Sequence, residues 1–243
     1  MATRSPSPVS VARNLGRIVD RLSFASPVSH VYNPLAYAFD AHKSYIERYY
    51  NPHAEVLLVG MNPGPWGMVQ TGVPFGEIRA VKDWLGITDG VKKPRSEHDK
   101  RPIEGFDCQR SEVSGRRLWS WAQDRFGTPH SFFKHFFVWN YCPLAFMEKS
   151  GRNRTPDKLP PSERTPLFEA CDGALMEIVA RLCPSHVLGI GKFAYDRARS
   201  ALEDDTFQIG QILHPSPASP AANRGWAAQI ETQFAEIGIP IPD

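Results

Sequence analysis

The stretch Glu55–Glu77, EVLLVGMNPGPWGMVQTGVPFGE, decides the fold. Its start, Glu55–Val59, is a short apolar run of the length expected for a buried strand. The eighteen residues from Gly60 onward hold five glycines and three prolines. Proline stiffens a loop, and glycine lets the backbone approach a ligand closely. The stretch therefore predicts a strand that leads into a ligand-binding loop, although a tight structural loop would have the same composition.

Three further apolar runs have the length of strands, at Phe136–Asn140, His186–Ile190 and Phe207–Leu213. Helical patterns lie between and around them, at residues 10–23, 33–50, 166–182 (capped by Thr165, with Pro166 first), 193–202, and from the cap Asn223 to Gly238. Residues 151–161 are expected to form a loop. This alternation favours an α/β fold, in which helices cover both faces of a parallel sheet. We expect one domain over residues 1–243, with residues 1–8 flexible.

The composition excludes several classes of protein. A hydrophobic fraction of 42% supports a core, and a net charge of +2 does not by itself indicate a nucleic-acid partner. No apolar run approaches the ~20 residues of a membrane span, and the N-terminal segment lacks the apolar stretch of a secretion signal. We expect a monomer without membrane contact, in the cytoplasm or nucleoid of a bacterium or the nucleus of a eukaryote.

The cysteine spacing indicates neither a zinc site nor an iron–sulfur cluster, because no pair forms a C-x-x-C clip. We therefore predict no metal and no cofactor. Free, buried thiols in a reducing compartment are expected instead. The four residues are Cys108, Cys142, Cys171 and Cys183.

Polar residues stand at the ends of three predicted strands. Asn62 follows the first, Asn140 ends the second and His214 follows the fourth. Ligands of open α/β sheets bind at the carboxyl ends of strands, so these side chains are expected to share one pocket. Each residue also has a simpler explanation. Asn62 could cap a turn, Asn140 could satisfy the backbone at a strand end, and His214 could be a hydrogen-bonded histidine in a loop.

Several motifs resemble the single-strand-selective monofunctional uracil-DNA glycosylases. They are Met61–Glu77, NYCPLAFM from Asn140, SGRN-TP from Ser150, and HPSP from His214 followed by NRGW. The resemblance runs from about Tyr32 to Phe234, and GMNPG and HPSP are its most specific parts. It implies a three-layer α/β/α fold with a central parallel sheet of four strands. The implied activity is DNA repair, by excision of uracil and 5-hydroxymethyluracil, but not thymine, from single- or double-stranded DNA.

The resemblance also carries roles over to positions of this sequence. Asn62 matches the residue that positions the attacking water, and His214 matches the histidine that faces the pyrimidine O2. Asn140 matches the asparagine that reads the base edge, and Phe75 the ring on which the base stacks. The remaining expected pocket residues are Gly60, Met61, Gly64 and Met68.

The chain departs from the family pattern after HPSP. The family usually has a basic wedge residue there, but this chain has Ala218, a poor wedge. Arg224 is a candidate to fill the gap. The expected DNA contacts are Pro215, Ser216, Pro217, Ala218, Arg224 and Arg152, with further phosphate candidates at Lys92, Lys93, Arg95, Lys100, Arg101 and the turn 150–154.

These residue types suit cleavage of an N-glycosidic bond. An imidazole N–H of His214 can stabilise the departing base anion, and the Asn62 amide can hold a water although it cannot act as a strong base. No lysine or terminal amine presents itself as a Schiff-base nucleophile, so a monofunctional enzyme is expected. Two alternatives stay open, namely a glycosylase for xanthine or hypoxanthine and a module that binds flipped or single-stranded bases without cleavage.

Overall fold

Four parallel strands form the centre of the computed structural model, which describes residues 7–202 and 206–241. Their order is β3-β2-β6-β7. The strands are β2 Val56–Gly60, β3 Phe136–Asn140, β6 His186–Ile190 and β7 Gln208–Ile212. The predicted four-stranded parallel sheet is thus confirmed, with strand ends within about one residue of expectation. All four carboxyl ends meet at one edge, where Gly60 lies opposite Asn140.

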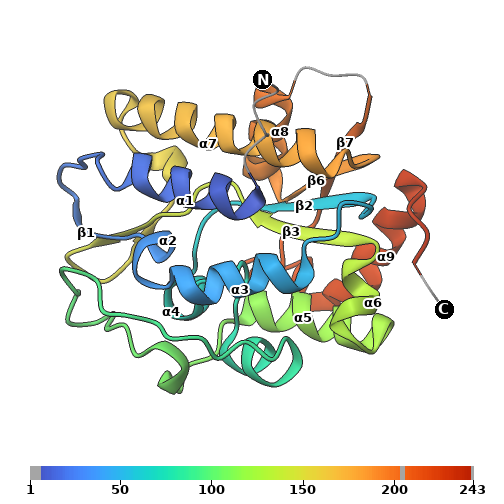
Figure 1. The fold of residues 1–243 in the computed structure, drawn as a ribbon, viewed down its shortest axis with the longest axis horizontal. Coiled ribbons are helices and arrows are strands. Elements are labelled where there is room, and N and C mark those ends of the chain that lie inside the picture. Colours follow the sequence, from blue (N-terminus) through green and yellow to red (C-terminus); the bar gives the residue numbers. More distant parts are fainter. Residues whose placement is uncertain (1–6, 203–205, 242–243) are drawn as a thin grey trace.

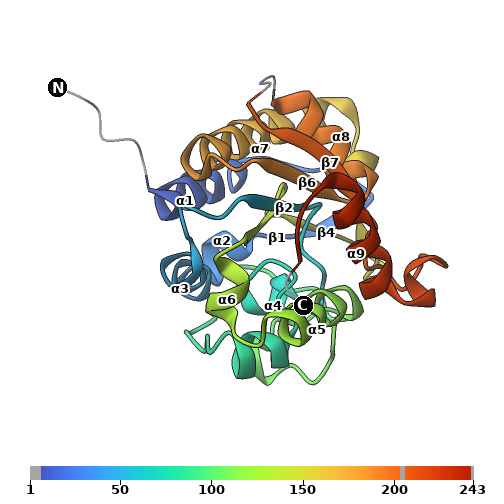
Figure 2. The same ribbon diagram turned by 90° about the vertical axis from the view of Figure 1, so that its right-hand side faces the viewer.

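Helices cover both faces of this sheet, in three layers (Figures 1 and 2). One face carries α7 and α8, the other carries α3, α5, α6 and α9, and α1 contacts both α3 and α7. The α-helices are α1 Pro8–Val19, α2 Pro34–Tyr37, α3 Phe39–Tyr49, α4 Met68–Thr71, α5 Val113–Phe126, α6 Pro129–Phe133, α7 Pro161–Leu182, α8 Lys192–Ala201 and α9 Trp226–Ile237. Short helices are the π-helix η1 Ala80–Trp84 and the 3₁₀ helices η2 Gly105–Asp107, η3 Pro156–Lys158 and η4 Ala222–Arg224.

A second, antiparallel sheet was not predicted. It consists of β1 Val28–Tyr32, β4 Ala145–Glu148 and β5 Asn153–Arg154, in the order β1-β4-β5. The expectation of a plain loop over 151–161 is therefore wrong, since β5 and η3 fall inside it. Strand β1 pairs with a partner more than a hundred residues away, and such pairing leaves no mark in the local sequence.

Several helix boundaries differ from the prediction for identifiable reasons. Helix α1 begins at Pro8 because the Ser7 side chain caps it by accepting a hydrogen bond from the Ser10 backbone N–H. Ser7 and Pro8 are thus part of the cap rather than a flexible tail, while residues 1–6 lie outside the described residues. The single helix expected over 33–50 is two helices, α2 and α3, which meet at Ala38.

Two predicted caps are wrong. Helix α7 begins at Pro161 and not at the predicted Thr165–Pro166 pair, so Pro166 lies inside the helix. Proline suits the first position of a helix, because a backbone N–H there would have no partner within the helix. Asn223 does not cap α9, because its side chain bonds Arg117 and the Pro217 carbonyl. Gly225 occupies the cap position instead, with φ +104°. Gly238 ends α9 as predicted, in the left-handed conformation that glycine favours.

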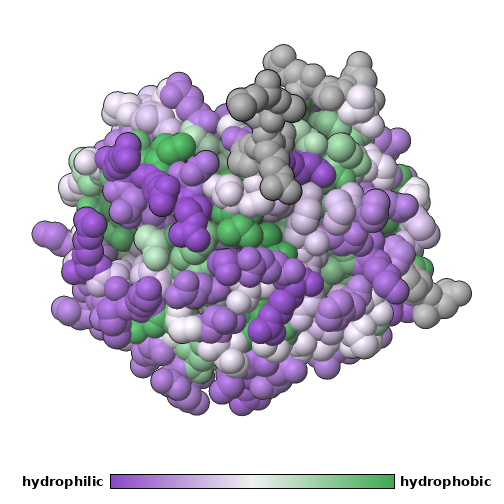
Figure 3. All heavy atoms as spheres, viewed as in Figure 1, coloured by the Kyte–Doolittle hydropathy of each residue, from purple (hydrophilic) through white to green (hydrophobic). Residues whose placement is uncertain are grey.

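Aromatic side chains fill the space between the sheet and α3, α5, α6 and α9. Trp121 stacks on Phe234, and Phe132 on Phe136, within one large buried cluster. The face of the molecule shown in Figure 3 is mostly hydrophilic. Among the described residues, no helix is long and apolar enough to cross a membrane, and no group of His, Cys, Asp or Glu could hold a metal ion.

The four cysteines are free thiols, three of them buried. Cys183 is exposed, contrary to expectation, because it forms the left-handed C-terminal cap of α7 at the surface.

Candidate functional site

A cavity of about 370 Å³ lies at the carboxyl edge of the parallel sheet. Asn62, Asn140 and His214 all line it, although they are far apart in sequence. They meet because they follow or end β2, β3 and β7, three parallel strands of one sheet. The other lining residues are Met61, Pro63, Gly64, Phe75, Glu112, Ser114, Asn153, Thr155 and Ser216. A larger hollow of about 750 Å³ between η1 and α5 contains none of the predicted site residues.

The amide of Asn140 is held in one orientation. Its Nδ2 donates to Met68 Sδ at 3.1 Å, while its Oδ1 faces Gly60, where a Cβ atom would approach it to 2.2 Å. Because the two amide ends have different neighbours, the side chain presents a fixed pattern of donor and acceptor. Met68, which was expected among the pocket residues, is buried, and its sulfur accepts the hydrogen bond that orients the Asn140 amide.

Phe75 occupies a strained backbone conformation at the site, with φ +52°. Its carbonyl accepts a hydrogen bond from the Trp119 indole N–H at 3.0 Å, and Gly115 allows that carbonyl to approach α5. The ring packs against Gly60, where a Cβ atom would come within 2.6 Å of it. These contacts fix the position of the Phe75 ring, which lines the cavity.

The amide of Asn62 is also oriented by a neighbour. Its Nδ2 donates to the Leu144 carbonyl at 3.2 Å, which leaves Oδ1 as the end available for a ligand. The loop that carries it is fastened by Asn153, whose Nδ2 donates to the Pro63 carbonyl at 3.1 Å. Asn153 lines the cavity, as does Thr155. Asn153 was expected only as part of the candidate phosphate-binding turn 150–154, and Thr155 had no predicted role, although both lie in the SGRN-TP motif.

Burial keeps His214 neutral. Desolvation lowers the pKa of its imidazole from 6.5 to about 4. At neutral pH the ring therefore has one N–H donor and one acceptor. Gly191, at φ +87°, makes room for it, because a Cβ atom there would lie 3.0 Å from the Cβ atom of His214.

The loop after His214 is anchored to α5. Arg117 donates to the Pro215 carbonyl at 3.1 Å, to the Ser216 carbonyl at 3.2 Å and to Asn223 Oδ1 at 2.7 Å. Sequence reasoning missed Arg117, because nothing in its neighbourhood marks a contact almost a hundred residues away. Pro215 is buried, so its carbonyl shapes the loop, whereas Pro217 and Ala218 are exposed.

Glu112 and Ser114, at the start of α5, line the cavity without having been predicted. The Glu112 carboxyl oxygen Oε2 is buried and has no hydrogen-bond partner among the described residues. Burial raises its pKa from 4.5 to about 7, with a smaller contribution from the charge of Glu77. No motif in the sequence marks this position.

The predicted phosphate contacts divide into two groups. Lys93 and Arg154 form ion pairs with Glu97 and Glu148, and Lys92 lies 3.8 Å from Asp40. Arg95, Lys100, Arg152 and Arg224 are exposed, as Lys92 and Lys93 are, but they form no ion pair with another described residue.

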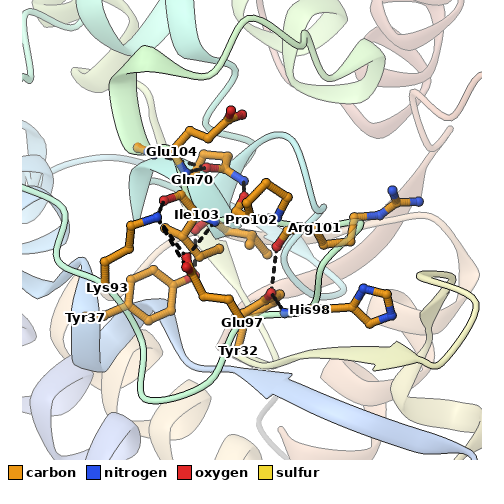
Figure 4. Close-up of polar contacts among 12 residues, drawn as sticks. Tyr32, Tyr37, Gln70, Lys93, Glu97, His98, Arg101, Pro102, Ile103 and Glu104 are labelled. Atoms are coloured by element: carbon orange, nitrogen blue, oxygen red, sulfur yellow. Dashed lines mark hydrogen bonds and ion pairs between the residues drawn. The ribbon is translucent and has the colours of Figure 1, made fainter.

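Trp66, in the loop beside the cavity, carries two guanidinium groups near its ring. Arg101 lies 5.0 Å and Arg110 lies 4.5 Å from the ring centroid. The backbone at Arg101 is held by Tyr32, whose hydroxyl donates to the Arg101 carbonyl at 2.6 Å. Figure 4 shows that the Arg101 side chain extends away from this network. In the same network the Gln70 side chain donates to the Pro65 carbonyl at 3.1 Å and to the Pro102 carbonyl at 3.0 Å. This joins the glycine-rich loop to the segment around Arg101.

Comparison with known proteins gives a consistent result. The profile of the uracil DNA glycosylase superfamily matches residues 47–235. The chain is 48% identical to the single-strand selective monofunctional uracil-DNA glycosylase of Rattus norvegicus, over 91% of this chain and 80% of that protein. It is 45% identical to the protein of the same name from Bos taurus, over 96% and 89%. The crystal structure of wild-type SMUG2 from Pedobacter heparinus has a similar fold, with a TM-score of 0.65, 16% identity, and coverage of 94% and 98%.

Proposed function

Since the chain belongs to the single-strand-selective monofunctional uracil-DNA glycosylases of the uracil DNA glycosylase superfamily, we propose that it flips uracil out of DNA and hydrolyses the N-glycosidic bond. The product is an abasic site in an unbroken strand. The observation that carries this proposal is the convergence of Asn62, Asn140 and His214 on one cavity. The relatives' names favour uracil over deaminated purines, and favour catalysis over mere binding.

His214 stabilises the leaving group in this mechanism. As the glycosidic bond breaks, positive charge develops on the sugar and negative charge on the base. A neutral imidazole N–H directed at O2 stabilises the base anion, and such a donor lowers a barrier by on the order of 3 kcal/mol. The depressed pKa of His214 keeps this neutral donor form in place at physiological pH.

Asn62 positions the nucleophile. Its Nδ2 is occupied by the Leu144 carbonyl, so Oδ1 can accept a hydrogen bond from a water on the sugar face opposite the base. An amide cannot remove a proton efficiently, but attack on a sugar that is already cationic needs little help from a base. The contribution of Asn62 is therefore orientation.

Asn140 reads the base while Phe75 supports its face. The fixed amide accepts from uracil N3–H through Oδ1 and donates to O4 through Nδ2, whose second hydrogen bonds Met68. Cytosine presents the opposite pattern at these two positions and is disfavoured. Gly60 permits this arrangement, because any side chain there would collide with both Asn140 and Phe75.

DNA is held by exposed basic side chains and by the loop that Arg117 anchors. Ser216, Pro217 and Ala218 lie at or beside the cavity mouth, and Arg152 and Arg224 are exposed cations. The stack of Arg101 and Arg110 on Trp66 adds two cations beside the glycine-rich loop. Both single- and double-stranded DNA are proposed substrates, and the protein acts as a monomer.

The decisive experiment uses an end-labelled oligonucleotide that contains one uracil. The protein should release uracil, and the strand should break only after alkali, as seen on a length gel. Breakage before alkali, or trapping of a covalent complex by borohydride, would contradict a monofunctional reaction. Binding without release of base would favour the binding-module alternative, and release only from xanthine or hypoxanthine oligonucleotides would favour the purine alternative.

A further inference from the structure

Glu112 is an acidic side chain in the cavity that the reaction described above does not use. It stands at the N-terminal cap position of α5, where a side chain commonly accepts a hydrogen bond from the first turn of the helix. Glu112 makes no such bond. The residue instead lines the cavity, and its carboxyl oxygen Oε2 is buried and has no hydrogen-bond partner in the described part of the chain.

The glycine-rich loop is shaped around this carboxyl group. A Cβ atom at Gly64 would lie 2.4 Å from both Glu112 oxygens, and one at Gly67 would lie 1.8 Å from Oε2. Only glycine leaves enough space at these two positions. An unpartnered buried carboxyl group costs free energy, so its retention beside two glycines indicates a function in the bound state.

The neighbours of Asn140 show which edge of the base Glu112 faces. Around a pyrimidine ring the order of groups is O2, N3, O4 and C5. In the proposed complex His214 meets O2, Asn140 Oδ1 on the Gly60 side meets N3, and Asn140 Nδ2 on the Met68 side meets O4. The next position in the same sense is C5, which follows O4 on the Met68 side of Asn140. Gly67 directly precedes Met68, and the carboxyl group of Glu112 packs against Gly67 and Gly64, so we assign Glu112 to the C5 side of the base.

We propose that Glu112 is a specificity-determining residue for the C5 substituent of the flipped base. Its carboxyl group accepts a hydrogen bond from a hydroxyl group carried on C5, as in 5-hydroxymethyluracil, and disfavours the methyl group of thymine. A methyl group against the carboxyl group cannot donate a hydrogen bond, so the buried Oε2 would stay without a partner. This inference rests on the proposed function, because it assumes the base orientation given above.

The protonation state of the carboxyl group should modulate this selection. Glu77 is the charged group that acts on Glu112, and it helps to raise the Glu112 pKa to about 7. His214, which lines the same cavity, is neutral near that pH. Above pH 7 the ionised carboxylate only accepts hydrogen bonds, and bonds to a charged acceptor are stronger. Preference for a hydroxyl substituent should therefore rise as the pH increases through 7.

The test measures single-turnover rates on oligonucleotides that contain uracil, 5-hydroxymethyluracil or thymine, and compares ratios so that a general loss of activity cancels. Glu112→Leu should lower the hydroxymethyluracil-to-uracil ratio about tenfold and raise the thymine-to-uracil ratio. Glu112→Gln keeps a hydrogen-bond acceptor, so it should retain most of the hydroxymethyluracil-to-uracil rate ratio. Because glutamine does not ionise, this ratio should no longer rise with pH in that variant. Glu236→Leu, at an exposed position on α9, is the matched control and should leave both ratios unchanged.

Unchanged ratios in a folded Glu112→Leu protein would overturn the proposal. If that variant fails to fold by circular dichroism, the pH profile of Glu112→Gln decides, and a profile like that of the wild type would equally overturn it. Failure of the wild type to release uracil would count instead against the proposed function. In that case, calorimetric binding of free 5-hydroxymethyluracil and uracil to the wild type and Glu112→Gln still tests the role of Glu112, and equal loss for both bases would refute it.

Discussion

Two amide side chains at the site owe their orientation to neighbours outside the reaction. Asn62 donates to the Leu144 carbonyl and Asn140 donates to Met68 Sδ. An amide that rotated freely would present nitrogen and oxygen interchangeably, and would lose both its hold on water and its preference for uracil. At the residue scale, the proposed chemistry therefore depends on these hydrogen bonds as much as on the amides themselves.

Replacement of Asn62 by alanine should lower the single-turnover rate on uracil-containing DNA by about 100-fold or more, because the water loses its position. Binding to the same DNA should persist, since the amide does not hold the base. Single-turnover kinetics and a fluorescence-anisotropy titration measure the two quantities. A near-normal rate in Asn62→Ala would remove this residue from the mechanism.

Asn140→Asp should raise the ratio of cytosine to uracil excision about tenfold, because a protonated or rotated carboxyl group no longer imposes the uracil pattern. The rate on uracil itself should fall. Parallel single-turnover assays on matched oligonucleotides give the ratio. If the ratio stays at its wild-type value, selectivity against cytosine comes from elsewhere in the pocket.

The imidazole of His214 should titrate with a midpoint of about 4 instead of 6.5, because burial penalises the charged form. The protonated fraction is therefore negligible at neutral pH and grows only as the pH falls toward 4. An NMR titration of the ring C–H signals measures this midpoint, and His214→Asn identifies the signal. A midpoint near 6.5 would argue that the ring is solvated and would weaken the neutral-donor mechanism.

At the element scale, α5 organises the site from a distance. It begins at Val113, directly after the cap residue Glu112, and makes room for the Phe75 carbonyl at Gly115. It anchors the loop after β7 through Arg117 and bonds the Phe75 carbonyl through Trp119. One helix thus sets the positions of segments that follow two different strands of the sheet.

Arg117→Ala should reduce the single-turnover rate on the order of tenfold, because the carbonyls of Pro215 and Ser216 lose their donor and the loop beside His214 loosens. Arg116→Ala is the matched control, since Arg116 is exposed on the same helix and its side chain bonds, among the described residues, only the nearby Ser111. Equal rates for the two variants would show that the anchor is not needed for catalysis.

At the scale of the whole molecule, the surface must handle nucleic acid with a net charge of only +2. Phosphate binding then depends on local groups of cations. One such group, Arg101 and Arg110 on the Trp66 ring, lies beside the site. The exposed tip of the loop after β7 carries Ala218, which is too small to fill the gap that a flipped base leaves in a duplex.

Uracil should consequently be excised faster from single strands than from duplex DNA, and Ala218→Arg should narrow that difference by adding a wedge. Single-turnover rates on the two substrates, at one salt concentration, measure it. Arg224→Ala serves as the comparison. If the difference between the single-strand and duplex rates is larger in that variant than in the wild type, Arg224 already acts as the wedge. No effect of Ala218→Arg would place the wedge outside this loop.

The sequence by itself determined the parallel sheet, the order of its strands along the chain and the three polar strand ends, because apolar runs and turn residues are local signals. Motif resemblance added the family, which the comparisons bear out. Tertiary structure alone decided the second sheet, the N-terminal caps of α7 and α9 and the contributions of Glu112 and Arg117. These depend on contacts between segments distant in sequence, such as Glu112 against Gly64 and Arg117 against Pro215, and no local pattern records which distant partner a side chain will meet.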